Sequence, residues 1–142
     1  MNIIFIISII LLIMFFMNKN EGINIQIKKS NLSNSGNGVF AGKDFKINEY
    51  IEIFPYLVEY KKNVKGILSN YYFNGIKYGK NKIIFPLGYG GIYNHSFKPN
   101  AKYYDLGNKK MGIVASRRIR KGEEIYISYG KKYWKTRSIN PK

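Results

Sequence analysis

Cysteine is absent from this 142-residue chain, and histidine and tryptophan occur once each. Without cysteine the chain can form neither a disulfide nor the thiolate zinc clusters for which cysteine is the usual ligand. A single histidine cannot build a metal site unaided. We therefore expect chemistry that needs no metal ion.

Acidic residues are also few, because 8 Asp and Glu stand against 24 Lys and Arg, giving a formal net charge of +16. A field of this size favours association with polyanions, such as nucleic acid or anionic lipid. The lysines are scattered along the chain, so an ordinary solvated basic surface is an equal alternative. Contact with nucleic acid or a nucleosome is thus one partnership that the composition allows.

Residues 3–17 form a single long hydrophobic run, interrupted only by Ser8. As a helix this run would reach about 23 Å, short of a hydrocarbon core of about 30 Å, so it could span only a thin bilayer. We expect residues 1–17 to be an N-terminal hydrophobic helix that anchors the chain. A cleaved signal remains open, although a basic n-region and a small-residue cleavage site are missing. A buried or unstructured tail is the third alternative.

Lysines follow the hydrophobic run, at Lys19, Lys28 and Lys29. By the positive-inside bias, an anchored chain would place its domain on the cytoplasmic side of the membrane. If the anchor is not used, we expect a cytoplasmic or nuclear protein.

The remaining sequence predicts one mostly β domain over residues 23–134, after a linker at 18–22 and before a basic tail at 135–142. Apolar and polar positions alternate there, and Ile, Tyr and Phe are abundant, as is typical of half-buried strands. Residues 64–73 are expected to form a short helix or an irregular insert. The predicted strands, spaced for several small sheets, are 23–27, 39–41, 50–54, 83–85, 101–104, 111–115 and 125–129.

A pseudo-repeat supports this organisation, since residues 39–51 align without a gap against residues 113–125. In each copy a strand ends at alanine, an apolar residue follows, and a residue tolerant of positive φ makes a turn before a glutamate. The pattern predicts two similar strand-turn-strand units. The aligned pairs are Ala41 with Ala115, Phe45 with Ile119, Asn48 with Gly122, and Glu49 with Glu123.

Two motifs carry the functional signal: the loop Asn94-His95-Ser96-Phe97-Lys98-Pro99-Asn100 and the segment Glu124-Ile125-Tyr126-Ile127-Ser128-Tyr129. Together they resemble the signature motifs of SET-domain protein-lysine methyltransferases, and the resemblance covers almost all of residues 23–134. It is closest to small viral and bacterial members that lack flanking cysteine clusters. It implies the SET fold, in which several small sheets surround a knot-like C-terminal substructure.

The resemblance also implies the site and its co-substrate, S-adenosylmethionine, with no metal. Tyr129 matches the catalytic tyrosine, and Ile127 and Tyr103 match positions along the channel for the substrate lysine. His95 is expected to fix its loop more than to act as a base. The residues matched to the methyl donor are Ser35, Gly36, Asn37 and Gly38 of a Gly-x-Gly motif, then Asn94, His95 and Trp134, the last stacking on adenine or packing at the end of the domain.

The implied activity is transfer of a methyl group from S-adenosylmethionine to the side-chain amine of a protein lysine, with histones among the candidate substrates. The alternative is a catalytically inactive, membrane-tethered module of the same fold that binds nucleic acid or anionic lipid. The charge of +16 would repel a basic histone tail within the screening length of about 8 Å. Either nucleosomal DNA supplies the attraction, or the substrate carries acidic flanks.

Overall fold

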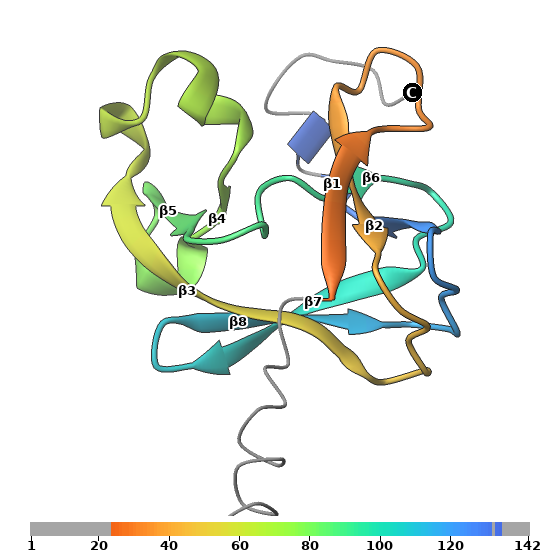
Figure 1. The fold of residues 1–142 in the computed structure, drawn as a ribbon. Helices are drawn as coiled ribbons and strands as arrows, with labels where there is room; N and C mark the ends of the chain where they lie inside the picture. Colours follow the sequence, from red (N-terminus) through yellow and green to blue (C-terminus); the bar gives the residue numbers. More distant parts are fainter. Residues whose placement is uncertain (1–23, 132, 135–142) are drawn as a thin grey trace, which may run out of the picture.

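A computed structural model describes residues 24–131, 133 and 134 of the chain (Figure 1). The predicted hydrophobic helix at 1–17, the linker at 18–22 and the tail at 135–142 lie outside the described residues. Within the described ranges, no helix has the length and apolar character needed to cross a membrane.

Two sheets make up the domain, which confirms the predicted mostly β class. In the four-stranded sheet, β9 lies between β2 and β6, pairing antiparallel with β2 and parallel with β6. The strands of this sheet, in spatial order, are β1 (Ile25–Lys29), β2 (Asn37–Ala41), β9 (Glu124–Ile127) and β6 (Asn94–His95).

The second sheet has five antiparallel strands, with the long strand β3 at its centre. Its strands, in spatial order, are β4 (Phe73–Asn74), β5 (Lys82–Pro86), β3 (Tyr50–Tyr60), β8 (Lys110–Ala115) and β7 (Ala101–Gly107). Three short 3₁₀ helices lie between β3 and β5, at η1 (Lys61–Asn63), η2 (Gly66–Asn70) and η3 (Ile76–Tyr78). In Figure 1 the segment from η1 to η3 lies on the opposite side of the domain from β1 and β2.

The predicted strand at 125–129 ends early, because β9 stops at Ile127. The last ladder bond runs from the Ser96 N–H to the Ile127 carbonyl, at 3.1 Å. The next inward-facing amide, that of Tyr129, donates to the imidazole Nδ1 of His95 at 3.1 Å. A side chain thus replaces a strand partner, and the expectation that Tyr129 lies on a strand was wrong.

The pseudo-repeat is a structural pair, as predicted. Phe45 and Ile119, both buried, exchange backbone hydrogen bonds of 2.8 and 3.0 Å. The turn residues Asn48 and Gly122 have φ of 64° and 83°, the left-handed region that the alignment required. Each turn residue donates its N–H to the alanine carbonyl of the other copy, at 2.9 Å for Asn48 and 2.7 Å for Gly122.

The core lies between the two sheets and consists of apolar side chains from both. Strand β8 is buried at every position from Met111 to Ala115, whereas β3 alternates between buried and exposed residues from Glu52 to Leu57. Each copy of the pseudo-repeat also buries its apolar residue, Phe45 or Ile119, in this core. The core thus fixes the loops between strands, and those loops carry the site.

Candidate active site

Two neighbouring cavities, of about 480 and 720 Å³, lie side by side and share part of their walls. The residues lining both cavities are Asn70, Tyr71, Gly91, Tyr129 and Tyr133. The predicted catalytic residue Tyr129 therefore stands at the boundary between two spaces. This is the arrangement that a reaction between two separately bound molecules needs.

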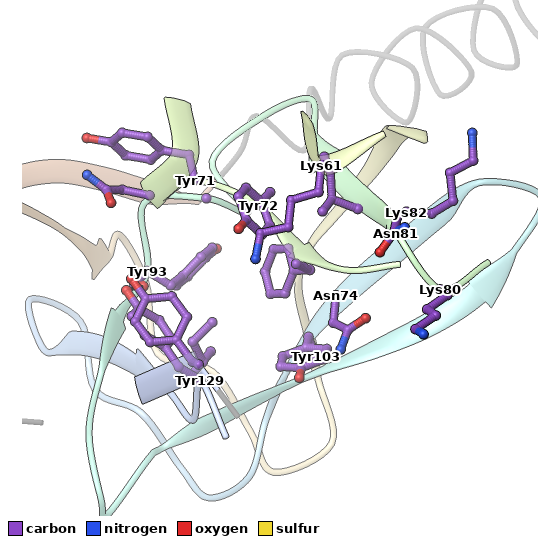
Figure 2. A pocket seen from close by; sticks show the side chains of 17 residues that line it. Lys61, Tyr71, Tyr72, Asn74, Lys80, Asn81, Lys82, Tyr93, Tyr103 and Tyr129 are labelled. Carbon is purple, nitrogen blue, oxygen red and sulfur yellow. Dashed lines mark hydrogen bonds between the residues drawn. The ribbon is translucent and has the colours of Figure 1, made fainter. Parts of the chain in front are cut away.

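Seven aromatic residues are among the 17 that line the smaller cavity. Tyr103 and Ile127, both predicted from the sequence to line a lysine channel, contribute to its wall. Tyr103 packs edge-on against Phe73, with 5.0 Å between ring centroids. Figure 2 shows Tyr93 beside Tyr129 at one end of this cavity. A wall of this kind suits an aliphatic chain such as that of lysine.

The larger cavity is lined by Ser35, Gly36, Asn37 and Asn94, four of the residues predicted to bind the methyl donor. Gly36 has φ of 67°, and a β-carbon there would meet no atom within 4 Å. The backbone at this turn therefore faces open space and is accessible to a ligand.

Gly38 packs against Glu124 and Asn94 and does not face the larger cavity. A β-carbon on Gly38 would collide with the Glu124 carboxylate and would lie 3.1 Å from the Asn94 amide nitrogen. The second glycine of the motif is thus needed for close packing against Glu124, and it does not line either cavity. Its role toward the donor stays a prediction.

Tyr129 is held at both its backbone and its side chain. Its hydroxyl donates to the Tyr93 carbonyl oxygen at 2.7 Å, and its N–H donates to Nδ1 of His95. Its ring lies 4.5 Å from that of Tyr133 and stacks on Trp134 with 22° between the planes. The phenol is thereby fixed in one orientation at the boundary between the cavities.

His95 supports this tyrosine and does not line either cavity. Its side chain is 9% exposed, and burial lowers its pKa, so the ring is neutral near pH 7. Because Nδ1 accepts the Tyr129 N–H, the proton lies on Nε2, which has no hydrogen-bond partner among the described residues. Its ring also packs against Phe97 and Trp134. This agrees with the expectation that His95 fixes its loop.

Trp134 packs on the His95 and Tyr129 rings, with centroids 4.9 and 5.9 Å away. It does not contribute to the lining of either cavity, so the described geometry favours the packing role over adenine stacking. Stacking on the donor stays a prediction.

Glu124 is a central residue of the site that the sequence suggested only as the start of a strand. Its carboxylate, on a side chain 2% exposed, accepts the Asn94 amide N–H at 3.1 Å, and the same amide nitrogen donates to the Asn37 carbonyl at 3.1 Å. Burial raises the pKa of Glu124, but hydrogen bonds outweigh burial and the pKa lies below its usual value. The other donors are the Ser30 hydroxyl, the Asn31 N–H and the Tyr126 hydroxyl, at 2.7, 2.8 and 2.8 Å.

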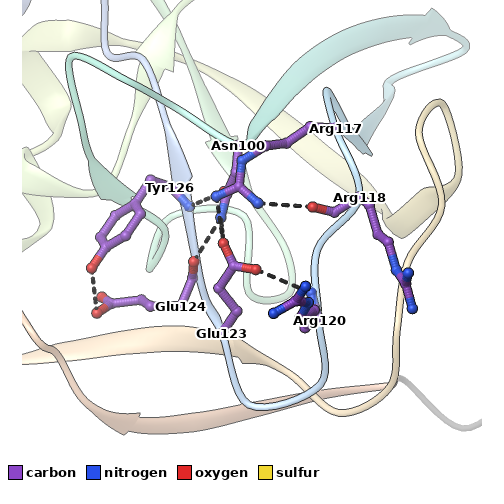
Figure 3. A network of polar contacts seen from close by, with 7 residues as sticks. All are labelled: Asn100, Arg117, Arg118, Arg120, Glu123, Glu124 and Tyr126. Carbon is purple, nitrogen blue, oxygen red and sulfur yellow. Dashed lines mark hydrogen bonds and ion pairs between the residues drawn. The ribbon is translucent and has the colours of Figure 1, made fainter.

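Asn100 ties the end of the Asn94–Asn100 loop to β9 (Figure 3). Its amide nitrogen donates to the Glu124 carbonyl at 2.8 Å, and its amide oxygen accepts the Tyr126 N–H at 2.7 Å. The side chain is 1% exposed, so no water can replace these bonds. The Asn100 amide thus adds two hydrogen bonds to the links between the two signature motifs.

Glu52 fixes the loop that carries Tyr93, a residue of the smaller cavity, and it was not predicted as a site residue from the sequence. Its buried carboxylate accepts the Tyr89 N–H at 2.8 Å and the Tyr93 hydroxyl at 3.0 Å. Burial raises its pKa. Glu52 therefore positions the loop whose Tyr93 carbonyl holds Tyr129. An acidic residue inside an otherwise apolar strand was the signal that could have revealed it.

Comparison with known proteins places these features in a family. The SET domain profile matches residues 36–130. A Schizosaccharomyces pombe protein named histone-lysine N-methyltransferase, H3 lysine-37 specific, is 33% identical over 104 residues, which cover 70% of this chain and 69% of that protein. A Candida glabrata protein named histone-lysine N-methyltransferase, H3 lysine-36 specific, is 33% identical over 128 residues, covering 78% of this chain but 17% of that protein.

Among solved structures, a Plasmodium falciparum protein described as a candidate histone methyltransferase matches with a TM-score of 0.64 and 38% identity, covering 78% of this chain and 96% of that one. No group of three or more metal-ligating side chains occurs among the described residues. The expectation that this chain most resembles viral and bacterial SET proteins stays a prediction, because the three relatives named here are neither viral nor bacterial. The matched profile, the relatives and the site geometry agree, and the chain belongs to the SET domain family of protein-lysine methyltransferases.

Proposed function

We propose that this chain transfers a methyl group from S-adenosylmethionine to the side-chain amine of a lysine in a protein. The position of Tyr129 between the two cavities is the observation that carries the proposal. The larger cavity is assigned to the donor and the smaller, aromatic one to the lysine. S-adenosylmethionine supplies, when bound, a methyl group on a sulfonium that is open to in-line displacement.

The larger cavity has properties that suit a donor of this size. Its volume of about 720 Å³ lies within the range of cofactor sites, about 300 to 1,000 Å³. The open backbone at Gly36 and the polar side chains of Ser35 and Asn37 offer hydrogen bonds to the donor. Asn94, which is fixed by its hydrogen bond to Glu124, lines the same cavity and would also contact the donor.

The smaller cavity and Tyr129 would prepare the lysine. Free lysine has a pKa of about 10.4, and an apolar channel favours the neutral amine that can attack. The Tyr129 oxygen, fixed by its bond to the Tyr93 carbonyl, would accept a hydrogen bond from this amine and orient it. The carbonyl would hold the polarised methyl through weak C–H···O contacts. The aromatic wall would exclude water.

A protein lysine is the substrate that we propose, and histones are the first substrates to test, because the names of two relatives specify lysines of histone H3. The test is transfer of labelled methyl to core histones, nucleosomes and a cell lysate, together with a calorimetric titration of the donor. Micromolar donor binding and label on a lysine would support the proposal. Absence of both would overturn it in favour of an inactive binding module.

Two finer features are also proposals. A knot-like passage of the C-terminal segment is supported by β9, which lies between two strands distant in sequence, β2 and β6. Attachment to a membrane through residues 3–17, with the domain toward the cytoplasm, rests on the sequence alone.

A further inference from the structure

Three lysines line the smaller cavity, and two of them lie at the end away from Tyr129. In Figure 2, Lys80 and Lys82 lie at the opposite end from the Tyr93–Tyr129 pair, and Lys61 reaches over the cavity. Strand pairing brings these lysines together. Tyr60 at the end of β3 pairs with Lys82 at the start of β5, and the next residue, Lys61, donates its N–H to the Asn81 carbonyl at 2.8 Å.

No described residue lining either cavity is an aspartate or a glutamate. The described carboxylates all make other hydrogen bonds or ion pairs, and Glu59 is the one that also attracts a cavity lysine, Lys82. Glu52 and Glu124 are buried in the bonds given above, and Glu59 accepts hydrogen bonds from the Tyr60 N–H and the Asn63 amide. The remaining four form ion pairs, Asp44 with Arg118, Glu49 with Lys43, Asp105 with Lys77, and Glu123 with Arg117.

The three lysines form no ion pair within the described part of the chain. The ammonium of Lys82 lies 3.1 Å from the centre of the ring of Tyr60, a residue outside the cavity lining. Lys61 and Lys80 are exposed. Glu59, on the strand paired with β5, attracts Lys82 but does not line the cavity. This end of the cavity therefore presents several positive charges, and none of its lining residues is a carboxylate that would neutralise them.

We propose that the lysine-lined end selects substrates in which acidic side chains flank the target lysine; this inference rests on the proposed function. A peptide whose lysine enters beside Tyr129 would lay neighbouring residues toward Lys61, Lys80 and Lys82. A cavity of about 480 Å³ has room for peptide side chains. Arginine and lysine flanks would be repelled there, and aspartate or glutamate flanks attracted.

The test uses the full chain, labelled S-adenosylmethionine and two peptide pools with a central lysine. One pool has Asp and Glu at the flanking positions, and the other has Lys and Arg. We expect kcat/KM to be about tenfold higher for the acidic pool at low salt, the scale of two or three exposed ion pairs. The preference should shrink to about threefold or less near 0.5 M salt, where screening is strong.

The matched variants are two triple charge reversals. Lys61→Glu, Lys80→Glu and Lys82→Glu together should abolish or invert the preference. Lys46→Glu, Lys110→Glu and Lys121→Glu make the same change in net charge at exposed sites outside both cavities and should retain it. Donor binding by each variant checks that it is folded.

The outcomes separate the two proposals. Equal labelling of the pools by active wild-type enzyme, or equal effects of the two triple variants, would overturn the acidic-flank inference alone. Absence of labelling in both pools and in whole lysate would overturn the proposed function and this inference with it.

Discussion

At the scale of single residues, the site is built by side chains that position other groups. His95 accepts the Tyr129 N–H, Glu124 accepts the Asn94 amide, and Glu52 holds the loop of Tyr93. All three are buried, and none of them lines a cavity. The two residues proposed to contact the reactants, Tyr129 and Asn94, are thus preorganised before either ligand binds.

Replacing Tyr129 with Phe removes one hydroxyl and keeps the ring. Because that hydroxyl is proposed to orient the amine, we expect kcat to fall by roughly 10², the scale of one preorganised polar contact. Donor affinity should change little. Steady-state kinetics and calorimetry measure the two effects, with Tyr104→Phe, an exposed tyrosine on β7, as the control. A Tyr129→Phe enzyme of near wild-type rate would remove this hydroxyl from the mechanism.

The sequence motifs located the residues around the site, but they did not show which of these residues line a cavity. Ser35, Gly36, Asn37 and Asn94, which the motifs predict to bind the methyl donor, line the larger cavity. Gly38, His95 and Trp134 were predicted beside them but do not line this cavity, and Trp134, which is half-buried, packs on the His95 ring. A motif fixes spacing along the chain, whereas the side of the backbone that meets a ligand depends on tertiary contacts such as that of Gly38 with Glu124.

At the scale of elements, the site depends on how the Asn94–Asn100 loop is fastened to β9. Strand β6 has only two residues, so its own ladder is short. The Asn100 amide adds two hydrogen bonds at the other end of the loop. The loop is therefore held at both ends.

Asn100→Ala should be strongly destabilising. It leaves the Glu124 carbonyl and the Tyr126 N–H buried without their partner, at about 1 to 3 kcal/mol for each group. We expect the free energy of unfolding to fall by about 2 to 5 kcal/mol in urea titrations. Asn63→Ala, which removes an exposed hydrogen bond to Glu59, should cost about 0.5 kcal/mol or less. Equal losses for the two variants would contradict the role given to Asn100.

The strands were predictable where alternation extends over several residues, and each of the seven predicted segments overlaps an observed strand. The two-residue strands β4 and β6 were missed, because two residues carry no period. The early end of β9 depends on the His95 imidazole, a contact between segments distant in sequence. The pseudo-repeat was predictable because its turns require a left-handed residue, and Asn48 and Gly122 supply it.

At the scale of the whole molecule, stability should fall as the pH drops below neutrality. Burial lowers the pKa of His95, so below about pH 6.5 the unfolded chain binds a proton that the folded chain does not. The loss begins near pH 6.5 and is complete once the pH reaches the folded-state pKa. Its slope is at most about 1.4 kcal/mol per pH unit. No other histidine is present to add to it.

Urea unfolding between about pH 7.5 and 5.5 measures this slope, and His95→Gln should flatten it. Glu52 acts in the opposite sense, because burial raises its pKa and its contribution is lost as the pH rises through that value. Glu52→Gln should therefore steepen the fall toward acid. An unchanged slope in His95→Gln would show that the histidine is not the titrating group.

Division of the site between two cavities that meet at Tyr129 is the central claim. The most direct test is a crystal structure of the chain with S-adenosylhomocysteine and a lysine peptide bound together. We expect the sulfur in the cavity of Gly36 and Asn94, the lysine amine in the cavity of Ile127 and Tyr103, and the Tyr129 hydroxyl near the line between them. Both ligands in one cavity, or a lysine amine far from Tyr129, would contradict the account.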